Sequence, residues 1–117
     1  MSFGVKTRKA EEISVVDISG KLTIGEPVLL LRETVRSLVT GGDNRIVLNL
    51  AEVSYIDSSG LGELVSSYTT IRNKGGDVKL LKLTSKTKDL LQMTKLLTVF
   101  DVYDDESKAI ASLKGQK

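Results

Sequence analysis

The segment 45–71 changes its hydrophobic periodicity at one short polar turn. The run Ile46–Leu50 is apolar and rich in β-branched residues, which predicts a buried strand. Beyond the turn, apolar residues recur at the spacing of one helix face, at Leu61, Leu64, Val65, Tyr68 and Ile71. A strand therefore passes into a helix N-terminus at Asp57–Gly62, which reads Asp-Ser-Ser-Gly-Leu-Gly. A strand followed at once by a helix is the repeating unit of α/β folds.

The N-terminal region predicts a pair of antiparallel strands. Apolar and polar residues alternate over 3–7, and Ile13–Ile18 is a second, largely apolar run. The polar turn Lys9–Glu12 separates them, and strands so close in sequence pair as a hairpin. Gly20 is expected to end the second strand, with residues 21–24 adding a short extended piece.

Helices and strands then alternate along the chain. The expected helices run from Gly25 to Gly41, from the serine turn to Gly75, from a Ser85 cap toward Leu97, and onward from an Asp104 or Asp105 cap, and the expected strands cover 45–50, 78–83 and 99–103. Because this order needs crossover connections, the later strands should be largely parallel. The sequence thus predicts an α/β fold with a mixed β-sheet, in which an antiparallel N-terminal hairpin is followed by alternating helices and largely parallel strands. We expect a single domain over 1–117, with 115–117 frayed.

The composition excludes several classes of function. The 117 residues include no cysteine and no histidine, so disulfides, the usual zinc sites and a Ser-His-Asp triad are ruled out. The net charge is +2 and only 4% of the residues are aromatic, whereas single-stranded nucleic-acid sites combine basic and aromatic side chains. The lysines at 79, 82, 86 and 88 are therefore interpreted as a solvated surface. We expect no direct contact with nucleic acid.

The chain also lacks the sequence signals of a membrane or secreted protein. No apolar segment approaches the roughly 18 residues that span a bilayer. The first residues, Met1–Lys6, contain no apolar core of a signal peptide. The expected location is the cytoplasm, with no membrane partner. The three consecutive leucines Leu29–Leu31 are expected to be core residues of the first helix.

The serine turn admits three chemical interpretations, because a helix N-terminus presents free N–H groups and a partial positive charge. A serine there can cap the helix, act as a nucleophile or carry a phosphate. One cap needs one residue, yet Asp57, Ser58 and Ser59 are all suited to it, so at least one hydroxyl should stay free. Gly60 and Gly62 disfavour the helix by about 1 kcal/mol each relative to alanine, which suggests that a partner approaches the backbone closely.

A nucleophilic serine is disfavoured. The turn does not match the Gly-x-Ser-x-Gly esterase elbow, and no lysine stands three residues after Ser58 or Ser59 to replace the absent histidine. The glycines of the turn match neither the phosphate-binding loop of nucleotide triphosphatases nor the dinucleotide fingerprint. A phosphoacceptor remains. A phosphoserine carries about −1.5 to −2 charges, and the helix dipole compensates part of that charge, so the modification should act on binding and not on folding.

The serine turn and its flanks resemble the signature of STAS-domain anti-sigma-factor antagonists. The resemblance rests on residues 49–62, and within them most specifically on Asp57–Gly62. Residues 73–80 resemble the end of a helix and the next strand in that family, and 90–97 resemble its third helix. The similarity extends over most of the chain, from about 5 to 113.

The family implies a partner switch in bacterial transcription and stress response, without enzymatic activity or a cofactor. The unphosphorylated antagonist binds an anti-sigma factor that is also a serine kinase, and this frees the sigma factor. The kinase then phosphorylates the antagonist with ATP and so releases it, and a serine phosphatase resets the switch. The acceptor in the family is the serine directly after the aspartate, which is Ser58 here.

The resemblance also implies the residues that meet the partner, namely Asp57, Ser59, Gly60, Leu61, Gly62 and Thr23. Ser59 is interpreted as a cap or a contact and not as the acceptor. Relatives often have aspartate at the position of Thr23, in a loop expected near the serine turn, so partner identity or dephosphorylation should differ. An alternative function is a STAS scaffold or adaptor subunit of a stress-signalling or transporter complex that involves no sigma factor.

Overall fold

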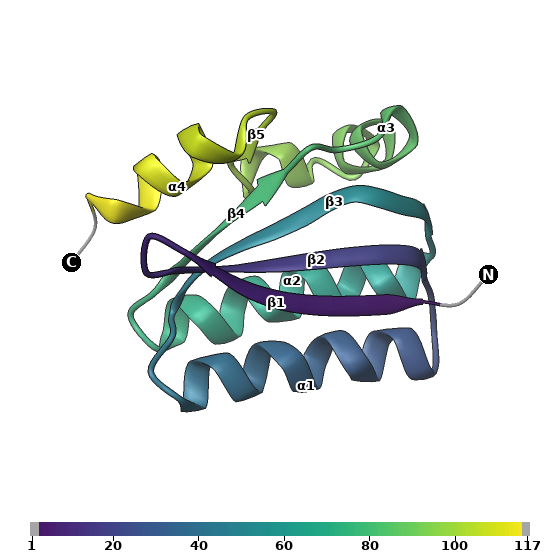
Figure 1. Ribbon diagram of the computed structural model, residues 1–117. Coiled ribbons are helices and arrows are strands. Elements are labelled where there is room, and N and C mark those ends of the chain that lie inside the picture. The colour runs from purple at the N-terminus through teal and green to yellow at the C-terminus, as the bar shows by residue number, and fades with distance from the viewer. Residues whose placement is uncertain (1–2, 116–117) are drawn as a thin grey trace.

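The computed structural model describes residues 3–115 and contains one five-stranded sheet with helices on both faces (Figure 1). In chain order the elements are β1 (Gly4–Ala10), β2 (Ile13–Leu22), α1 (Glu26–Thr40), β3 (Arg45–Ile56), α2 (Ser58–Asn73), β4 (Asp77–Leu81), α3 (Ser85–Met93), a 3-10 turn (Leu96–Thr98), β5 (Val102–Tyr103) and α4 (Glu106–Lys114). The strands lie side by side in sequence order, with β1 and β2 antiparallel and each later pair parallel. The predicted fold class is confirmed. The expected fraying of 115–117 falls largely on residues outside those described.

The hairpin forms because its turn has the backbone that two-residue connections need. Glu11 and Glu12 have φ angles of 52° and 72°, and Ala10 pairs directly with Ile13. Positive φ at both central residues matches the right-handed twist of the flanking strands. The register that follows directs alternate residues of β2 to opposite faces of the sheet.

Those two faces carry separate hydrophobic clusters. One face packs against α1, α2 and α3, with Val16, Leu48 and Leu80 among its buried strand residues. The other face packs against α4, through strand residues that include Val15 and Val47. A central strand buried on both sides reads as a nearly continuous apolar run, which is why Ile46–Leu50 is so apolar.

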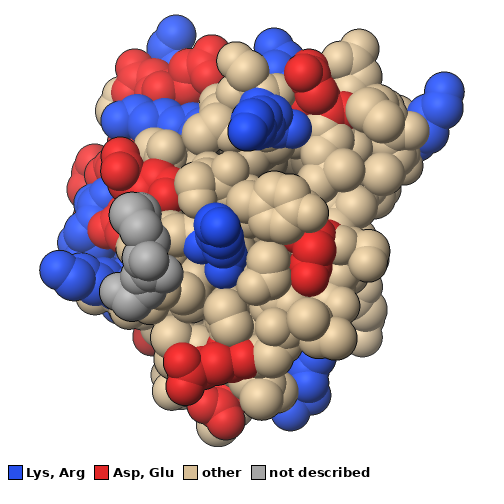
Figure 2. Space-filling model, turned by 90° about the vertical axis from the view of Figure 1, so that its right-hand side faces the viewer, with Lys and Arg blue, Asp and Glu red and all other residues tan. Residues whose placement is uncertain are grey.

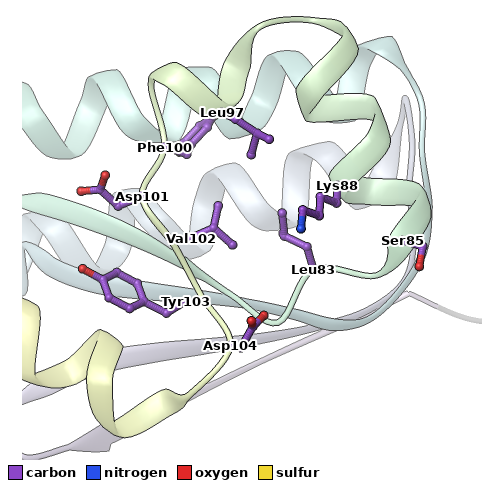
Figure 3. Close-up of a pocket in the computed structure, with 9 residues that line it drawn as sticks. All are labelled: Leu83, Ser85, Lys88, Leu97, Phe100, Asp101, Val102, Tyr103 and Asp104. Atoms are coloured by element: carbon purple, nitrogen blue, oxygen red, sulfur yellow. The ribbon is translucent and has the colours of Figure 1, made fainter.

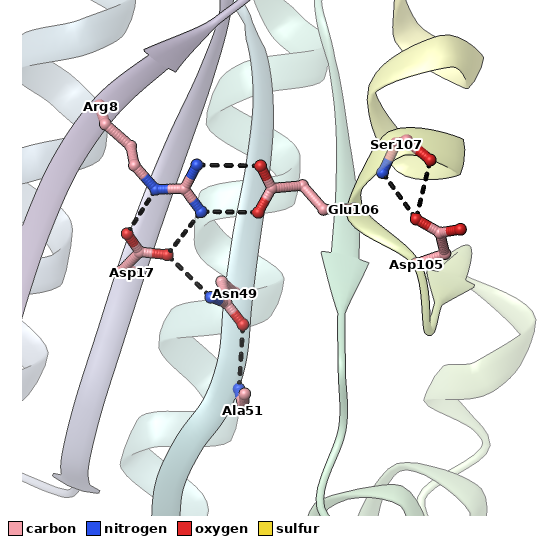
Figure 4. Close-up of polar contacts among 7 residues, drawn as sticks. All are labelled: Arg8, Asp17, Asn49, Ala51, Asp105, Glu106 and Ser107. Atoms are coloured by element: carbon pink, nitrogen blue, oxygen red, sulfur yellow. Dashed lines mark hydrogen bonds and ion pairs between the residues drawn. The ribbon is translucent and has the colours of Figure 1, made fainter.

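An arginine holds α4 to the sheet (Figure 4). Arg8 of β1 donates two hydrogen bonds to the Glu106 carboxylate, at 2.7 and 2.9 Å, and its Nε donates to Asp17 of β2 at 2.7 Å. Asn49 of β3 donates to the same Asp17 at 2.8 Å. The network thus links three strands to the first turn of the last helix.

Several predicted boundaries are wrong. β2 continues through Gly20 to Leu22, because the ladder with β3 absorbs two register shifts. β3 also runs on to Ile56, so both strands end at the serine turn. Helix α3 is capped by the side chain of Thr84, which accepts from the Thr87 N–H at 3.2 Å, and not by Ser85.

The structure also tests the predicted ends of the last elements, the predicted core leucines and the predicted surface lysines. α3 ends at Met93, and the last strand covers only 102–103. Asp105, one of the two predicted alternatives, caps α4. Leu29 is about half exposed, at 51%, and Leu30 is also exposed, so Leu31 alone confirms the expected core role. Lys79 is buried in β4 and pairs with two aspartates, whereas the other three lysines of the predicted solvated surface are exposed.

Candidate functional site

Asp57 fixes the serine turn by accepting hydrogen bonds from two different segments. Its Oδ1 accepts from the Gly60 N–H at 2.8 Å, which caps α2. Its Oδ2 accepts from the Ile24 N–H at 3.0 Å, in the loop between β2 and α1. These bonds, with that from Ile24 the stronger cause, hold the pKa of the Asp57 carboxyl below its usual range. The carboxylate therefore stays ionised and joins the loop to the helix.

Ser58 is the first residue of α2, and its side chain faces solvent. Within residues 3–115 the Ser58 hydroxyl takes part in no hydrogen bond. Ser59 is half-buried, and the cap that sequence reasoning allowed it belongs to Asp57 instead. The structure thus leaves a free hydroxyl at the N-terminus of a 16-residue helix, where N–H groups and the helix dipole favour negative charge.

The two glycines of the turn have different roles. A Cβ on Gly60 would lie 2.1 Å from the backbone oxygen of Leu22, at the end of β2. Gly60 is buried, and the close approach that the structure shows there is made by the chain's own backbone, while a partner contact at Gly60 stays a prediction. Gly62 is exposed, and a Cβ there would meet no atom within 4 Å. Leu61 is partly buried against the core.

Thr23 lies beside this turn, as the sequence predicts. The residue before it, Leu22, accepts from the Asp57 N–H at 3.3 Å, and the residue after it, Ile24, donates to the Asp57 carboxylate. Two backbone contacts therefore bracket Thr23 and hold its loop against Asp57. Any side chain at position 23 is close to the segment that carries Ser58.

Two large apolar side chains near the turn are exposed, and sequence reasoning did not assign them to the site. Ile24 is 75% exposed and Tyr55 is 51% exposed. Tyr55 also lines a hollow of about 330 Å³ with Ile56 of β3 and Leu90 of α3. The sequence did indicate that both residues lie at the carboxyl ends of adjacent parallel strands, which is where ligands of α/β sheets bind. Their exposure could not be known before the strands were placed.

Helix α2 is also held to α1 by a half-buried ion pair one turn further on. Glu63 is buried, and its Oε1 accepts a hydrogen bond from Nε of Arg32 at 3.0 Å and lies 3.0 Å from Nη2 of the same side chain. This contact joins the second turn of α2, the helix that begins at Ser58, to α1. Figure 2 shows the face at the carboxyl ends of β2 and β3, where mostly uncharged residues are interspersed with separate acidic and basic groups. A phosphate on this face would be a large local change of charge.

Two other kinds of site find no support in the described residues. Residues 3–115 hold no group of three or more carboxylates that could bind a metal ion. None of the helices within that range has both the length and the apolar character that crossing a membrane requires.

The arrangement of a mixed five-stranded sheet and an exposed serine at the start of α2 is that of a STAS domain. The STAS domain family model matches residues 5–109, and the chain belongs to this family. It is 30% identical over 102 residues to the anti-sigma-B factor antagonist of Bacillus subtilis, covering 87% of this chain and 92% of that protein.

Solved structures agree with the fold. The crystal structure of TM1081 from Thermotoga maritima superposes with a TM-score of 0.86 at 26% identity, covering 94% of each chain. Bacillus SpoIIAA, an anti-sigma factor antagonist, has been solved unphosphorylated and phosphorylated. These two forms superpose with TM-scores of 0.71 and 0.72, at 22% and 21% identity, and cover 97% and 95% of this chain and 99% and 98% of their own.

Proposed function

We propose that this protein is an anti-sigma factor antagonist that is switched by phosphorylation of Ser58. The observation that carries the proposal is the free, exposed hydroxyl of Ser58 at the start of α2, beside exposed Ile24 and Tyr55. The Bacillus subtilis relative supports the anti-sigma factor as the class of partner. The chain then acts by binding and not by catalysis, as one STAS domain over 1–117 in the cytoplasm, without direct contact with nucleic acid.

The switch follows from the charge of a phosphate. The Ser58 oxygen attacks the γ-phosphorus of ATP held by the kinase, the bond to the bridging oxygen breaks, ADP leaves, and a base takes the serine proton. The phosphoserine adds about −1.5 to −2 charges next to the ionised Asp57. A partner surface that covers Ile24 and Tyr55 would have to desolvate this charge, so binding is lost. A serine phosphatase restores binding by hydrolysing the phosphoserine.

The other residues of the turn support this role in different ways. Asp57 holds the backbone, and Gly60 allows α2 to start against β2. Gly62 and the exposed edge of the turn leave room for the kinase, and Ser59 and Leu61 form the neighbouring contact surface. Thr23, held beside Asp57, is proposed to set partner choice or the rate of dephosphorylation.

The test is phosphorylation by an anti-sigma factor with serine kinase activity. Purified protein, kinase and ATP are incubated, and the phosphate is located by mass spectrometry. Ser59→Ala is the matched control, because it removes the adjacent hydroxyl and keeps Ser58. We expect phosphate on Ser58 in the wild type and in Ser59→Ala, and none in Ser58→Ala. Phosphate on Ser59 alone, or on neither serine with every cognate kinase, contradicts the proposal.

Binding gives an independent measurement. Ser58→Ala should stay bound to the kinase in the presence of ATP, whereas Ser58→Glu should bind at least about tenfold more weakly, a difference of about 1.4 kcal/mol. Equal binding of the two variants would show that charge at this position is not the signal. A scaffold or adaptor function is the alternative, and it predicts stable binding to a multi-protein complex that does not change with either substitution.

A further inference from the structure

A second hollow, of about 810 Å³, lies at the end of β4 and β5 and is separate from the serine turn. Its walls come from the segment after β4, from α3, from the 3-10 turn and from β5. Figure 3 shows Leu83, Val102 and the Lys88 side chain pointing toward one another across this space. Its volume is within the range of pockets that hold small molecules, about 300–1,000 Å³.

The hollow is lined by apolar and polar residues together, and two of its charged side chains, of opposite sign, have no partner within residues 3–115. Its apolar lining residues are Leu83, Leu97, Phe100 and Val102. Asp101 is occupied, because its Oδ2 accepts from the Lys79 ammonium at 2.7 Å. Within residues 3–115, by contrast, Lys88 and Asp104 take part in no salt bridge or side-chain hydrogen bond. Figure 3 places the Lys88 ammonium and the Asp104 carboxylate on either side of Leu83.

We propose that this hollow binds a small zwitterion with an apolar body, of the chemical class of a short apolar peptide. Its carboxylate pairs with Lys88, its ammonium pairs with Asp104, and its side chains cover Leu83 and Val102. A ligand with only one charge forms one ion pair and leaves the other charged side chain of the hollow unpaired. A ligand with both charges forms two ion pairs, so the lining selects for it.

The site is independent of the proposed switch. Lys86, Thr87 and Leu90 of α3 line the smaller hollow beside Tyr55, whereas Ser85 and Lys88 of the same helix line the larger one. The two hollows thus lie along different flanks of α3. Failure of either proposal leaves the other intact.

The test uses the 117-residue chain, labelled with ¹⁵N and titrated with L-leucyl-L-leucine. We expect saturable shifts in the amide signals of residues 83–88 and 97–104. The matched probes are N-acetyl-leucyl-leucine, which lacks the ammonium, and leucyl-leucine amide, which lacks the carboxylate. Each should bind about fivefold or more weakly than the free dipeptide, since each loses one ion pair.

Two substitutions that each remove one positive charge from α3 distinguish a specific site from nonspecific electrostatic attraction of the ligand. Lys88→Gln should weaken the dipeptide by about fivefold and remove its advantage over the amide. Lys86→Gln, on the other flank of the same helix, should leave binding unchanged. Both side chains are exposed, so neither change should unfold the protein. The proposal is overturned by an absence of saturable shifts at about 10 mM dipeptide, by equal binding of all three probes, or by equal effects of the two substitutions.

Discussion

Replacing Gly60 by alanine should destabilise the protein, although alanine is the better helix former. The new Cβ would lie 2.1 Å from the Leu22 carbonyl oxygen and 3.0 Å from Cγ2 of Ile56. Carbon and oxygen normally approach to about 3.3–3.6 Å in such contacts, so the start of α2 must move by more than about 1 Å. The obstacle is backbone and cannot rotate away. The same Leu22 oxygen accepts from the Asp57 N–H, so moving the helix also weakens the turn.

The change in the free energy of unfolding is the sum of one stabilising and two destabilising effects. Alanine favours the helix over glycine by about 1 kcal/mol. Overpacking costs about 1–3 kcal/mol, with the upper end appropriate for a rigid backbone obstacle, and a weakened hydrogen bond adds about 1 kcal/mol. We expect Gly60→Ala to lower the free energy of unfolding by about 2–3 kcal/mol and the Tm by roughly 10 °C.

Gly62→Ala is the matched control, since the same substitution two residues later meets no atom within 4 Å. It should raise the free energy of unfolding by up to about 1 kcal/mol. The measurement is urea unfolding followed by circular dichroism, with the slope m compared to confirm that both variants unfold from the same native state. A Gly60→Ala protein as stable as the wild type would refute the reasoning, because it would show that α2 is free to start elsewhere.

Three further outcomes are expected. Ser58→Glu should change the free energy of unfolding by less than about 0.5 kcal/mol in urea titrations, because the side chain is exposed at a helix N-terminus, and a larger loss would mean that charge acts on folding. Lys79→Met should cost about 2 kcal/mol in the same assay, since it removes one of the two cations that pair with the buried Asp77 and leaves Arg72 as the other, and a neutral result would show that Arg72 alone satisfies that carboxylate. Hydrogen bonds from Arg8 lower the pKa values of Asp17 and Glu106, so their stabilisation is complete above the ordinary carboxyl pKa and is lost as the pH falls through the depressed values. The stability difference between the wild type and Arg8→Met should therefore shrink between pH 7 and pH 3, and a constant difference would contradict this account.

Sequence periodicity was sufficient to predict the sheet, because most of its elements depend on local patterns. The N-terminal hairpin, the apolar run Ile46–Leu50 and the helix after Ser58 each show their period within a few residues, although β1 continues to Ala10 through two residues of the predicted turn Lys9–Glu12. The ends of β2 and β3 could not be predicted in this way. Polar residues such as Lys21 and Ser54 stand in them, and they are kept extended by pairing between two strands far apart in the chain.

The site was predictable at the level of residue types but not of roles. A turn with three candidate caps indicated a free hydroxyl, and the structure assigns the cap to Asp57. The reason for Gly60 was missed, because it depends on the carbonyl of Leu22, which is 38 positions away in the sequence. Lys79 was interpreted as a surface residue for the same reason, since its aspartate partners are brought to it only by the fold.

The serine turn contains two sets of residues: some hold the backbone in place, and others face solvent. Asp57 bonds to the Ile24 and Gly60 N–H groups, and Gly60 packs against the Leu22 backbone, so a substitution at either position disturbs the cap or the contact with β2. Ser58, Gly62 and Ile24 face outward, and a change there leaves the described internal contacts in place. Because the two sets are distinct, side chains at the outward positions can change without loss of the fold. We propose that Thr23, which lies between two backbone contacts of the Asp57 segment, is a position where a change of side chain alters the partner or the rate of dephosphorylation while the turn is kept.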